Sequence, residues 1–256
     1  MILILSMVRG VEPLVLLLGL AAAAGDIIGG AIVAVPRRIS DRTLGLLMAL
    51  GAGNLLGVSV IELIPESLEA VGESGPLFIL GGYLLIHFFE HVFAPHLRFG
   101  EETHGNAIVD THVTSTAIIG LGLHAFMDGV AIGAAFIASP ALGVLVFAAI
   151  MLHKLPEGFT IASVMKAAGT TRSWALAASA ILAVATFAGV IVASAVGELA
   201  PYALALATGS VLYVGATDLM AEANKEEGIL NPVMVFLGIA MFFVVLTLVR
   251  FAGVKV

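Results

Sequence analysis

Apolar runs of roughly 20 residues recur along the chain, separated by short polar segments such as PRRISDR and AEANKEEGILNP. A helix of about 20 apolar residues is long enough to cross the hydrocarbon core of a bilayer. The pattern predicts an all-α integral membrane protein with eight transmembrane helices, in which residues 1–256 form one transmembrane domain. The segment PESLEAVGESG is expected to be the turn after the second span. The predicted spans cover residues 12–34, 44–64, 76–95, 113–138, 140–166, 173–197, 201–221 and 232–250.

The composition agrees with a protein that is surrounded mainly by lipid. Hydrophobic residues make up 60% of the 256 residues and charged residues 11%, whereas soluble proteins carry about 25% charged residues. The net charge is −7 and no dense basic cluster is present, so nucleic acid is not an expected partner. The chain has no cysteine, which excludes disulfides and thiolate metal sites.

Lysines and arginines in the predicted loops lie mostly on one side of the membrane. Because cytoplasmic loops carry the excess of Lys and Arg, that side is predicted to be cytoplasmic. The chain is then a multi-pass protein of the cell membrane with both termini outside (periplasmic or extracellular) and an inward-facing loop at about 96–112. The seven basic residues on the predicted cytoplasmic side are Arg37, Arg38, Arg42, Arg98, Lys166, Arg172 and Lys225.

A weak internal repeat relates the second and seventh predicted spans. The segment GNLLGVSVIELIPE (53–66) aligns without gaps on GSVLYVGATDLMAE (209–222), and Glu62 falls on Asp218. These spans cross in opposite directions in the predicted topology. Many transporters are built from inverted repeats of this kind.

Ionisable residues are concentrated in the fourth and fifth predicted spans, where burial in lipid is costly. His124 and Asp128 are four residues apart, as are His153 and Glu157, so each pair lies on one face of its helix. Two imidazoles and two carboxylates suit a borderline divalent ion such as Zn²⁺ or Fe²⁺. Pro156 removes a main-chain hydrogen bond and is expected to bend the fifth helix beside this site. The spacing predicts a metal site near the middle of the membrane.

The motifs HAFMDGVAIG (124–133) and HKLPEGFTIA (153–162), on adjacent helices of an eight-span chain, resemble the signature of the ZIP (Zrt-/Irt-like) family of divalent metal transporters. The resemblance is greatest to the prokaryotic GufA-like branch. It implies metal uptake into the cytoplasm, with spans 1–3 and 6–8 related by inverted symmetry around helices 4 and 5, and it is compatible with a homodimer. Carried over to this chain, the primary metal site of the family falls on His124, Asp128, His153 and Glu157.

Three departures from the motifs of two-metal family members imply a single transport site. Those members often have Asn after the fourth-span His and an acidic residue after the fifth-span His, where this chain has Ala125 and Lys154. The sixth span, which supplies another acidic ligand there, has no charged residue between Ser173 and Gly197. The ammonium of Lys154 is then an electrostatic substitute for the second metal, paired with a carboxylate of the site. In the alternative interpretation Lys154 extends toward a membrane interface.

Other polar residues are candidates for the ion path. Glu62, Glu66 and Asp218 are predicted to line the path or its entry, whereas Asp26 has no partner that the sequence assigns. The third loop and its edge contain histidines that are candidate cytoplasmic metal ligands, with ordinary solvated side chains as the alternative. These histidines are His91, His96, His104 and His112.

The predicted function is transport of divalent transition-metal ions by alternating access, with Zn²⁺ favoured over Fe²⁺, Cd²⁺ or Mn²⁺ as the transported substrate. One alternative is a membrane metal sensor, which would bind metal without flux. The other is an intramembrane metalloprotease, but that chemistry commonly uses His-Glu-x-x-His. Here HKLPE has Lys154 at the position of the base, so no enzyme activity is expected. The sequence does not determine whether the ion is taken up or exported, or whether the protein is a carrier or a channel.

Overall fold

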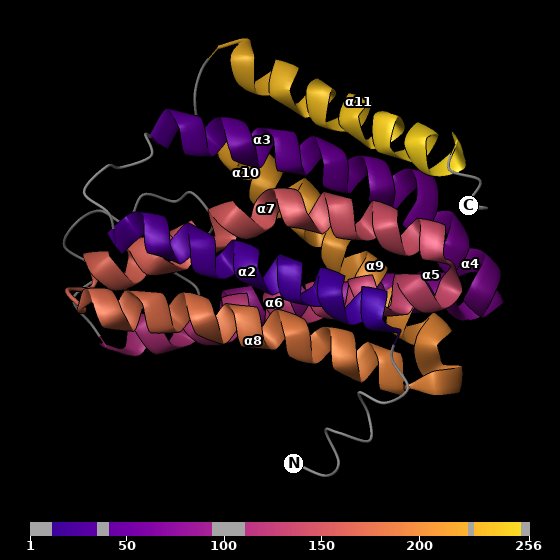
Figure 1. Ribbon diagram of the computed structural model, residues 1–256, viewed down its shortest axis with the longest axis horizontal. Helices are drawn as coiled ribbons and strands as arrows, with labels where there is room; N and C mark the ends of the chain where they lie inside the picture. Colours follow the sequence, from indigo (N-terminus) through magenta and orange to yellow (C-terminus); the bar gives the residue numbers. More distant parts are fainter. Residues whose placement is uncertain (1–11, 35–40, 94–110, 225–227, 252–256) are drawn as a thin grey trace.

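The computed structural model describes residues 12–34, 41–93, 111–224 and 228–251, and all regular elements in these ranges are helical (Figure 1). The predicted all-α class is therefore confirmed. The longer helices run roughly side by side as an elongated bundle. The elements are α2 (Pro13–Ala34), α3 (Asp41–Val58), η1 (Ser59–Leu63), α4 (Ile64–Val71), η2 (Gly72–Ser74), α5 (Gly75–Phe93), α6 (Thr111–Ala138), α7 (Pro140–Ala167), α8 (Arg172–Ala195), η3 (Gly197–Leu199), α9 (Ala200–Tyr213), η4 (Val214–Leu219), α10 (Met220–Ala223) and α11 (Leu230–Phe251).

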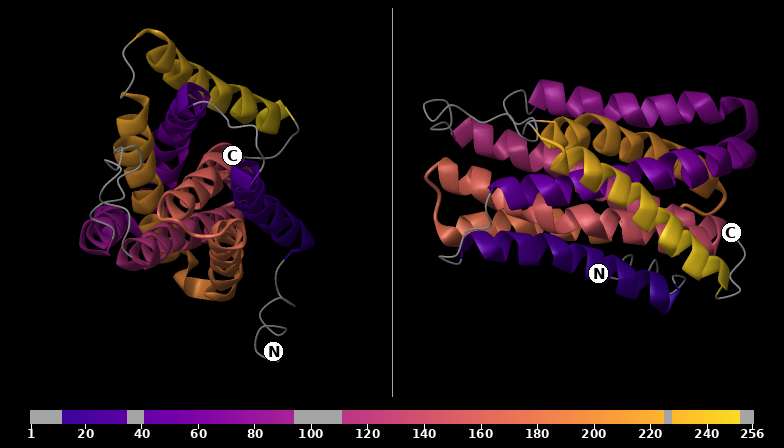
Figure 2. Two further views of the ribbon diagram at one scale, coloured as in Figure 1. Left: turned by 90° about the vertical axis from the view of Figure 1, so that its left-hand side faces the viewer. Right: turned by 90° about the horizontal axis from the view of Figure 1, so that it is seen from above.

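Seven helical stretches of the described residues are long and apolar enough to cross a membrane. One of them, Gly45–Val92, has 48 residues, and a straight helix of that length would be about 70 Å long, roughly twice the bilayer core. The chain instead turns back on itself at η2, as the right-hand view of Figure 2 shows. Gly72 begins this turn with φ of 68°, a conformation that glycine adopts without strain.

The second helical segment extends further than the sequence predicts. PESLEAVGESG was expected to be a turn, but the helix continues through Pro65 to Val71, and only Gly72–Ser74 forms the reversal. Pro65 follows directly on the π-helical segment η1, where the regular hydrogen-bond ladder of the α-helix is already interrupted, so its missing N–H is tolerated. The extension is held against α9 by a 2.9 Å hydrogen bond between the hydroxyls of Ser67 and Thr208.

Two short π-helical segments interrupt otherwise regular helices. The segment η1 follows α3, and η4 joins α9 to α10. In the gapless alignment of 53–66 with 209–222, residues 59–63 of η1 fall on residues 215–219 of η4. Single π-helical turns are often found at functional sites. The two segments related by sequence thus share a local irregularity that no apolar pattern predicts.

The helices pack in two groups. In one group α2 lies against α7 and α8, and α6 lies against α8 and α7; in the other, α3 packs on α11 and α5 packs on α9. The groups meet where α6 contacts α9 and α3 contacts α7. Viewed along the bundle in the left panel of Figure 2, α7 is close to the centre and α11 lies at the edge.

Small residues allow the helices of the first group to approach closely. A Cβ at Gly158 of α7 would coincide with the main-chain carbonyl of Asp26 on α2, and a Cβ at Gly129 of α6 would meet the carbonyl of Thr186 on α8. Small residues at helix contacts are typical of membrane bundles. The contact at Gly158 therefore brings Asp26 directly onto α7.

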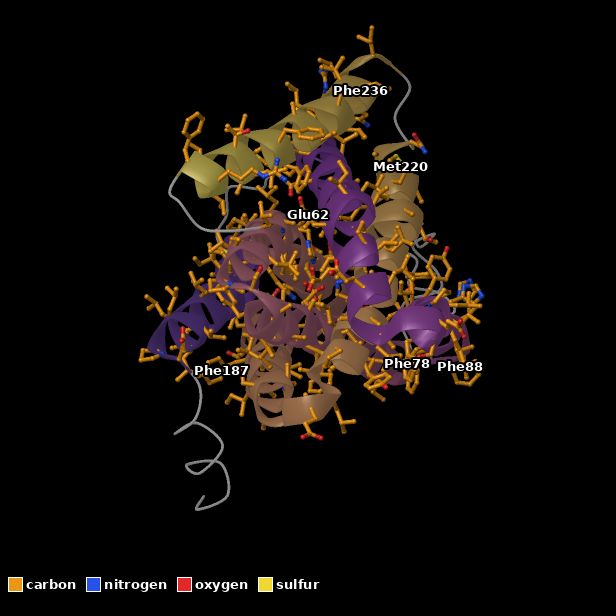
Figure 3. The ribbon with its side chains drawn as sticks, turned by 90° about the vertical axis from the view of Figure 1, so that its right-hand side faces the viewer. Glu62, Phe78, Phe88, Phe187, Met220 and Phe236 are labelled. Atoms are coloured by element: carbon orange, nitrogen blue, oxygen red, sulfur yellow. The ribbon has the colours of Figure 1, made fainter. Side chains whose placement is uncertain are left out.

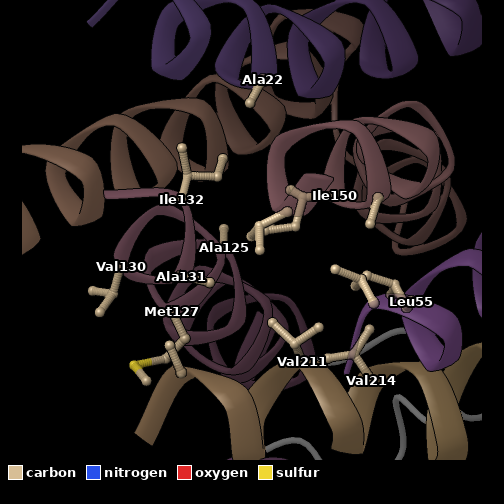
Figure 4. Close-up of a cluster of buried hydrophobic side chains, with 14 of the residues drawn as sticks. Ala22, Leu55, Ala125, Met127, Val130, Ala131, Ile132, Ile150, Val211 and Val214 are labelled. Atoms are coloured by element: carbon tan, nitrogen blue, oxygen red, sulfur yellow. The ribbon is translucent and has the colours of Figure 1, made fainter. Parts of the chain in front are cut away.

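The interior and the periphery of the bundle are both apolar. Figure 4 shows Ala22, Leu55, Ala125, Ile150 and Val211 converging from five helices on one buried cluster. Large apolar side chains also point outward, including the labelled Phe88 and Phe236 in Figure 3, of which Phe236 is 72% exposed. An apolar periphery suits hydrocarbon as the surrounding medium.

Candidate metal centre

Two adjacent helices supply the four residues that the sequence predicts as metal ligands. His124 and Asp128 lie one turn apart on α6, and His153 and Glu157 lie one turn apart on α7. Each is at most 2% exposed. One potential ligand atom from each residue lies within 4.8 Å of the others, so the two i, i+4 faces meet inside the bundle.

The carboxylate of Asp128 links the two helices. The His153 Nε2 lies 3.0 Å from Asp128 Oδ2, and the His124 Nε2 lies 3.3 Å from the same oxygen. The two imidazole rings are nearly perpendicular, at 87°, with centroids 5.8 Å apart. One carboxylate oxygen is therefore the point on which both histidines converge.

Several buried atoms of this cluster have no hydrogen-bond partner among the described residues. They include Asp128 Oδ1, His153 Nδ1 and Glu157 Oε1. Because buried polar atoms are nearly always hydrogen-bonded, such atoms in one place call for a bound species. Carboxylate oxygens and imidazole nitrogens are ligands that divalent transition metals accept.

Lys154 lies within the same cluster and is fully buried. Its ammonium donates to Glu157 Oε2 at 2.6 Å, and it lies 2.9 Å from Asp128 Oδ2 and 3.8 Å from Asp26 Oδ2. The predicted pairing with a carboxylate of the site agrees with this geometry. The alternative of a lysine extending to a membrane interface does not, because the side chain stays inside the bundle.

The helix that carries these residues begins with a capped turn and continues through its proline. Ser139 precedes Pro140, and its hydroxyl accepts a 3.1 Å hydrogen bond from the amide of Leu142. Pro156 lies inside α7, which remains one helix from Pro140 to Ala167. Pro156 has no N–H for the carbonyl of Leu152, which therefore lacks its usual helical partner.

The predicted path residues are placed in two different environments. Asp218 of η4 joins Glu90 and His124 in a second group whose potential ligand atoms lie within 4.8 Å of one another. Glu62 of η1 instead lies under α11 in Figure 3, with its Oε1 3.9 Å from Arg250 Nη2. Glu66, in α4, is partly exposed and belongs to neither of the two groups of potential metal ligands.

Glu90 was not predicted as a site residue. Its position between His87 and His91, at the end of the third predicted span, is a pattern that could have indicated it. A cavity of about 450 Å³ lies beside it. Two of its lining residues, Glu90 and Asp218, group with His124, and the cavity reaches His91 near the end of α5. Its polar lining consists of Tyr83, His87, Glu90, His91, Tyr213, Thr217 and Asp218.

The predicted loop histidines are only partly described. His91 is exposed on α5, its Nδ1 lies 2.8 Å from the carbonyl oxygen of His87, and the two rings are 4.0 Å apart. His96 and His104 lie outside the described residues. His112 belongs to α6, but its side chain is also outside them. A metal site in this loop stays a prediction.

Apolar helices of membrane-spanning length around a buried His/carboxylate cluster define a multi-pass membrane protein with a candidate intramembrane metal site. The family model described as ZIP Zinc transporter matches residues 100–246, more than half of the chain and all four predicted ligands. The chain belongs to the ZIP zinc transporter family, whose members are transporters and not enzymes.

Individual relatives agree with this assignment. The chain is 26% identical over 260 residues to zinc transporter ZIP9-A of Xenopus laevis, covering 81% of this chain and 84% of that protein. It is 31% identical over 131 residues to zinc transporter ZIP10 of Mus musculus, covering 48% of this chain and 16% of that one. Zinc transporter ZIP4 of Homo sapiens is 37% identical over 110 residues, or 42% of this chain and 17% of that protein.

Proposed function

We propose that this protein transports divalent transition-metal ions, with Zn²⁺ as the favoured substrate, through one site formed by His124, Asp128, His153 and Glu157. The observation that carries the proposal is the convergence of these four buried side chains from two adjacent helices. Fe²⁺, Cd²⁺ and Mn²⁺ are further candidate substrates, because imidazole and carboxylate ligands accept all of them.

The ligand set suits a transported ion better than a permanently bound one. Structural zinc sites typically use thiolates in a closed tetrahedral shell, and this chain has no cysteine. Two nitrogen and two oxygen ligands at a helix interface bind the ion and still release it. A membrane metal sensor would use the same ligands without flux, and membership of a transporter family argues against it.

The topology we propose has eight membrane crossings, with both termini outside and the 96–112 segment in the cytoplasm. The reversal at η2 supports dividing the 48-residue stretch Gly45–Val92 into two crossings. The matching positions of η1 and η4 support an inverted repeat of spans 1–3 and 6–8. The excess of basic residues in the predicted inner loops supports this orientation, and uptake into the cytoplasm is the direction that we propose.

Alternating access is the mechanism we propose. All four ligands lie in the group formed by α2, α6, α7 and α8, and movement of this group against α3, α5, α9 and α11 would open the site to one side at a time. The cavity beside Glu90 and Asp218 supports a route from His124 toward the end of α5. Glu62 and Glu66 belong to the opposite end of the path, near its entry.

We further propose that one metal ion is carried at a time, because the ammonium of Lys154 occupies the space between the carboxylates of the site. The homodimer and the prokaryotic branch of the family stay predictions. The mass of the purified protein in solution tests the homodimer. A sequence comparison with members of each branch of the family tests the branch.

The decisive experiment is zinc flux into proteoliposomes that contain the native chain, His153→Ala or Glu157→Ala. We expect saturable flux in the native protein and loss of at least about nine-tenths of it in both variants, since each removes one of four ligands. Glu69→Gln, at an exposed carboxylate of α4, is the matched control and should keep native flux. Equal flux in all four proteins would overturn the site, and stoichiometric zinc binding without flux would indicate a sensor.

A further inference from the structure

Asp26 is a buried carboxylate to which the four-ligand site assigns no role. It is fully buried on α2. Its main chain packs directly on Gly158 of α7, where no side chain larger than hydrogen fits. The residue is therefore held against the helix that carries His153 and Glu157.

The partners of Asp26 tie it to the charges of the metal centre. The hydroxyl of Thr186 donates a 3.3 Å hydrogen bond to Asp26 Oδ2, and the same oxygen lies 3.8 Å from the ammonium of Lys154. Asp26 Oδ1 has no hydrogen-bond partner among the described residues. A buried carboxylate with only one neutral donor depends on a nearby positive charge, and Lys154 provides it.

Lys154 is consequently surrounded by carboxylates from three helices. Asp26 approaches it from α2, Asp128 from α6 and Glu157 from α7. Of these, Asp128 and Glu157 are proposed metal ligands, and only Asp26 neutralises the ammonium without being one. Glu90 and Asp218 are not among the ion-pair partners of Lys154 in the described part of the chain; they group with His124 and line the cavity.

The formal charges of this group sum to a value that suits one divalent ion. With both histidines neutral, as metal binding requires, three carboxylates and one ammonium carry a charge of −2. A single M²⁺ brings the buried group to zero. Without Asp26 the group would carry −1, and Lys154 would have only the metal ligands as partners, so it would compete with the ion.

From these contacts we infer that Asp26 is a positioning residue: it holds and neutralises the ammonium of Lys154, so that Asp128 and Glu157 are left for one divalent cation. This inference rests on the proposed metal site and adds the residue that sets its charge. Asp26 acts through Lys154 and does not itself touch the metal.

The test is direct Zn²⁺ binding to the purified full-length chain in nanodiscs, measured by equilibrium dialysis and elemental analysis. The proteins are native, Asp26→Asn, Lys154→Met and the double variant Asp26→Asn/Lys154→Met. The matched control is Ser179→Ala, which removes another buried polar group of the α2–α7–α8 contact.

We expect one Zn²⁺ per native chain and roughly tenfold or greater weakening in Asp26→Asn, because one buried negative charge is lost. The double variant has no ammonium to compensate, so its affinity should return to within about threefold of native. Ser179→Ala should bind as the native chain does. Recovery in the double variant is a result that a purely structural role of Asp26 would not produce.

Unchanged binding in Asp26→Asn would overturn the inference and leave the transport site standing, and so would weakening that persists in the double variant. No stoichiometric binding by the native chain would instead count against the proposed function itself. If Asp26→Asn does not fold, Lys154→Met gives an independent answer. Since it removes an ammonium that lies beside Asp128 and Glu157, it should bind Zn²⁺ at least as tightly as the native chain, and weaker binding would contradict the inference.

Discussion

Asp128 Oδ2 lies 3.0 Å from the Nε2 of His153, although the two residues belong to different helices. The same oxygen is within 3.3 Å of His124 Nε2 and 2.9 Å of the ammonium of Lys154. Asp128 thus joins α6 to α7 through its contacts with His153 and Lys154. A metal ion bound at the proposed site would replace these contacts with coordination, which would couple binding to the geometry of the helix interface.

We predict that Asp128→Asn lowers zinc flux more than tenfold while the protein still folds. The amide keeps the size of the side chain and its carbonyl still accepts a hydrogen bond, but the negative charge that balances the cation is lost. Zinc uptake into proteoliposomes measures the loss, with size-exclusion chromatography as the check on folding. Flux within twofold of native would show that this carboxylate is not a ligand.

Metal binding is expected to weaken as the solution becomes more acidic. His124 and His153 must be neutral and the carboxylates ionised to coordinate metal, so protons compete with the ion. For each proton displaced on binding, the apparent affinity falls by about tenfold per pH unit on the acidic side. Equilibrium dialysis with Zn²⁺ between about pH 8 and about pH 5 measures this slope. A flat profile over that range would mean that the histidines do not bind the ion.

Asp218→Asn is expected to reduce flux several-fold and to leave equilibrium zinc binding within about threefold of native. Asp218 groups with Glu90 and His124 beside the cavity but is not one of the four ligands of the main site. On the proposed exit route, a carboxylate at this position would speed passage through electrostatic attraction. Paired measurements of flux and binding separate the two effects. Equal losses of flux and binding would assign Asp218 to the main site instead.

Gly158→Ala is predicted to destabilise the bundle by about 1–3 kcal/mol, the range for inserting a group into a packed interior. The added methyl would overlap the carbonyl of Asp26 and force α2 away from α7. Gly122→Ala in α6 is the control, because a Cβ there meets nothing within 4 Å. Thermal unfolding in detergent compares the two. Equal melting temperatures for both variants would contradict the close contact.

Much of the helical framework could be predicted because lipid-spanning helices need long apolar runs, and polar punctuation marks their ends. The ligand pairs were predictable for a related reason. A spacing of four residues puts His124 with Asp128, and His153 with Glu157, on one helix face whatever the tertiary structure. The structure brings these two faces together as expected.

Features that depend on contacts between distant helices were not predictable in this way. Asp26 had no assignable partner because nothing in the sequence shows that α2 approaches α7 at Gly158. Glu62 and Asp218 align in the repeat, yet Glu62 lies near Arg250 of α11 and Asp218 near His124. The turn predicted at PESLEAVGESG was wrong because the helix continues through Pro65, which follows the π-helical segment η1 where the regular hydrogen-bond ladder is already interrupted.

The contact between Gly158 and Asp26 has a consequence for how an ion crosses the membrane. It fixes α2 to α7, so any rearrangement that preserves this packing carries the carboxylate of Asp26 and the ammonium of Lys154 along with the ligands. In the proposed mechanism, the ion would then keep the same electrostatic surroundings whichever side of the membrane its site faces. In the proposed alternating-access mechanism, the ion and its ligands would therefore cross as a group of zero net charge, and the low-dielectric interior would not face an uncompensated double charge.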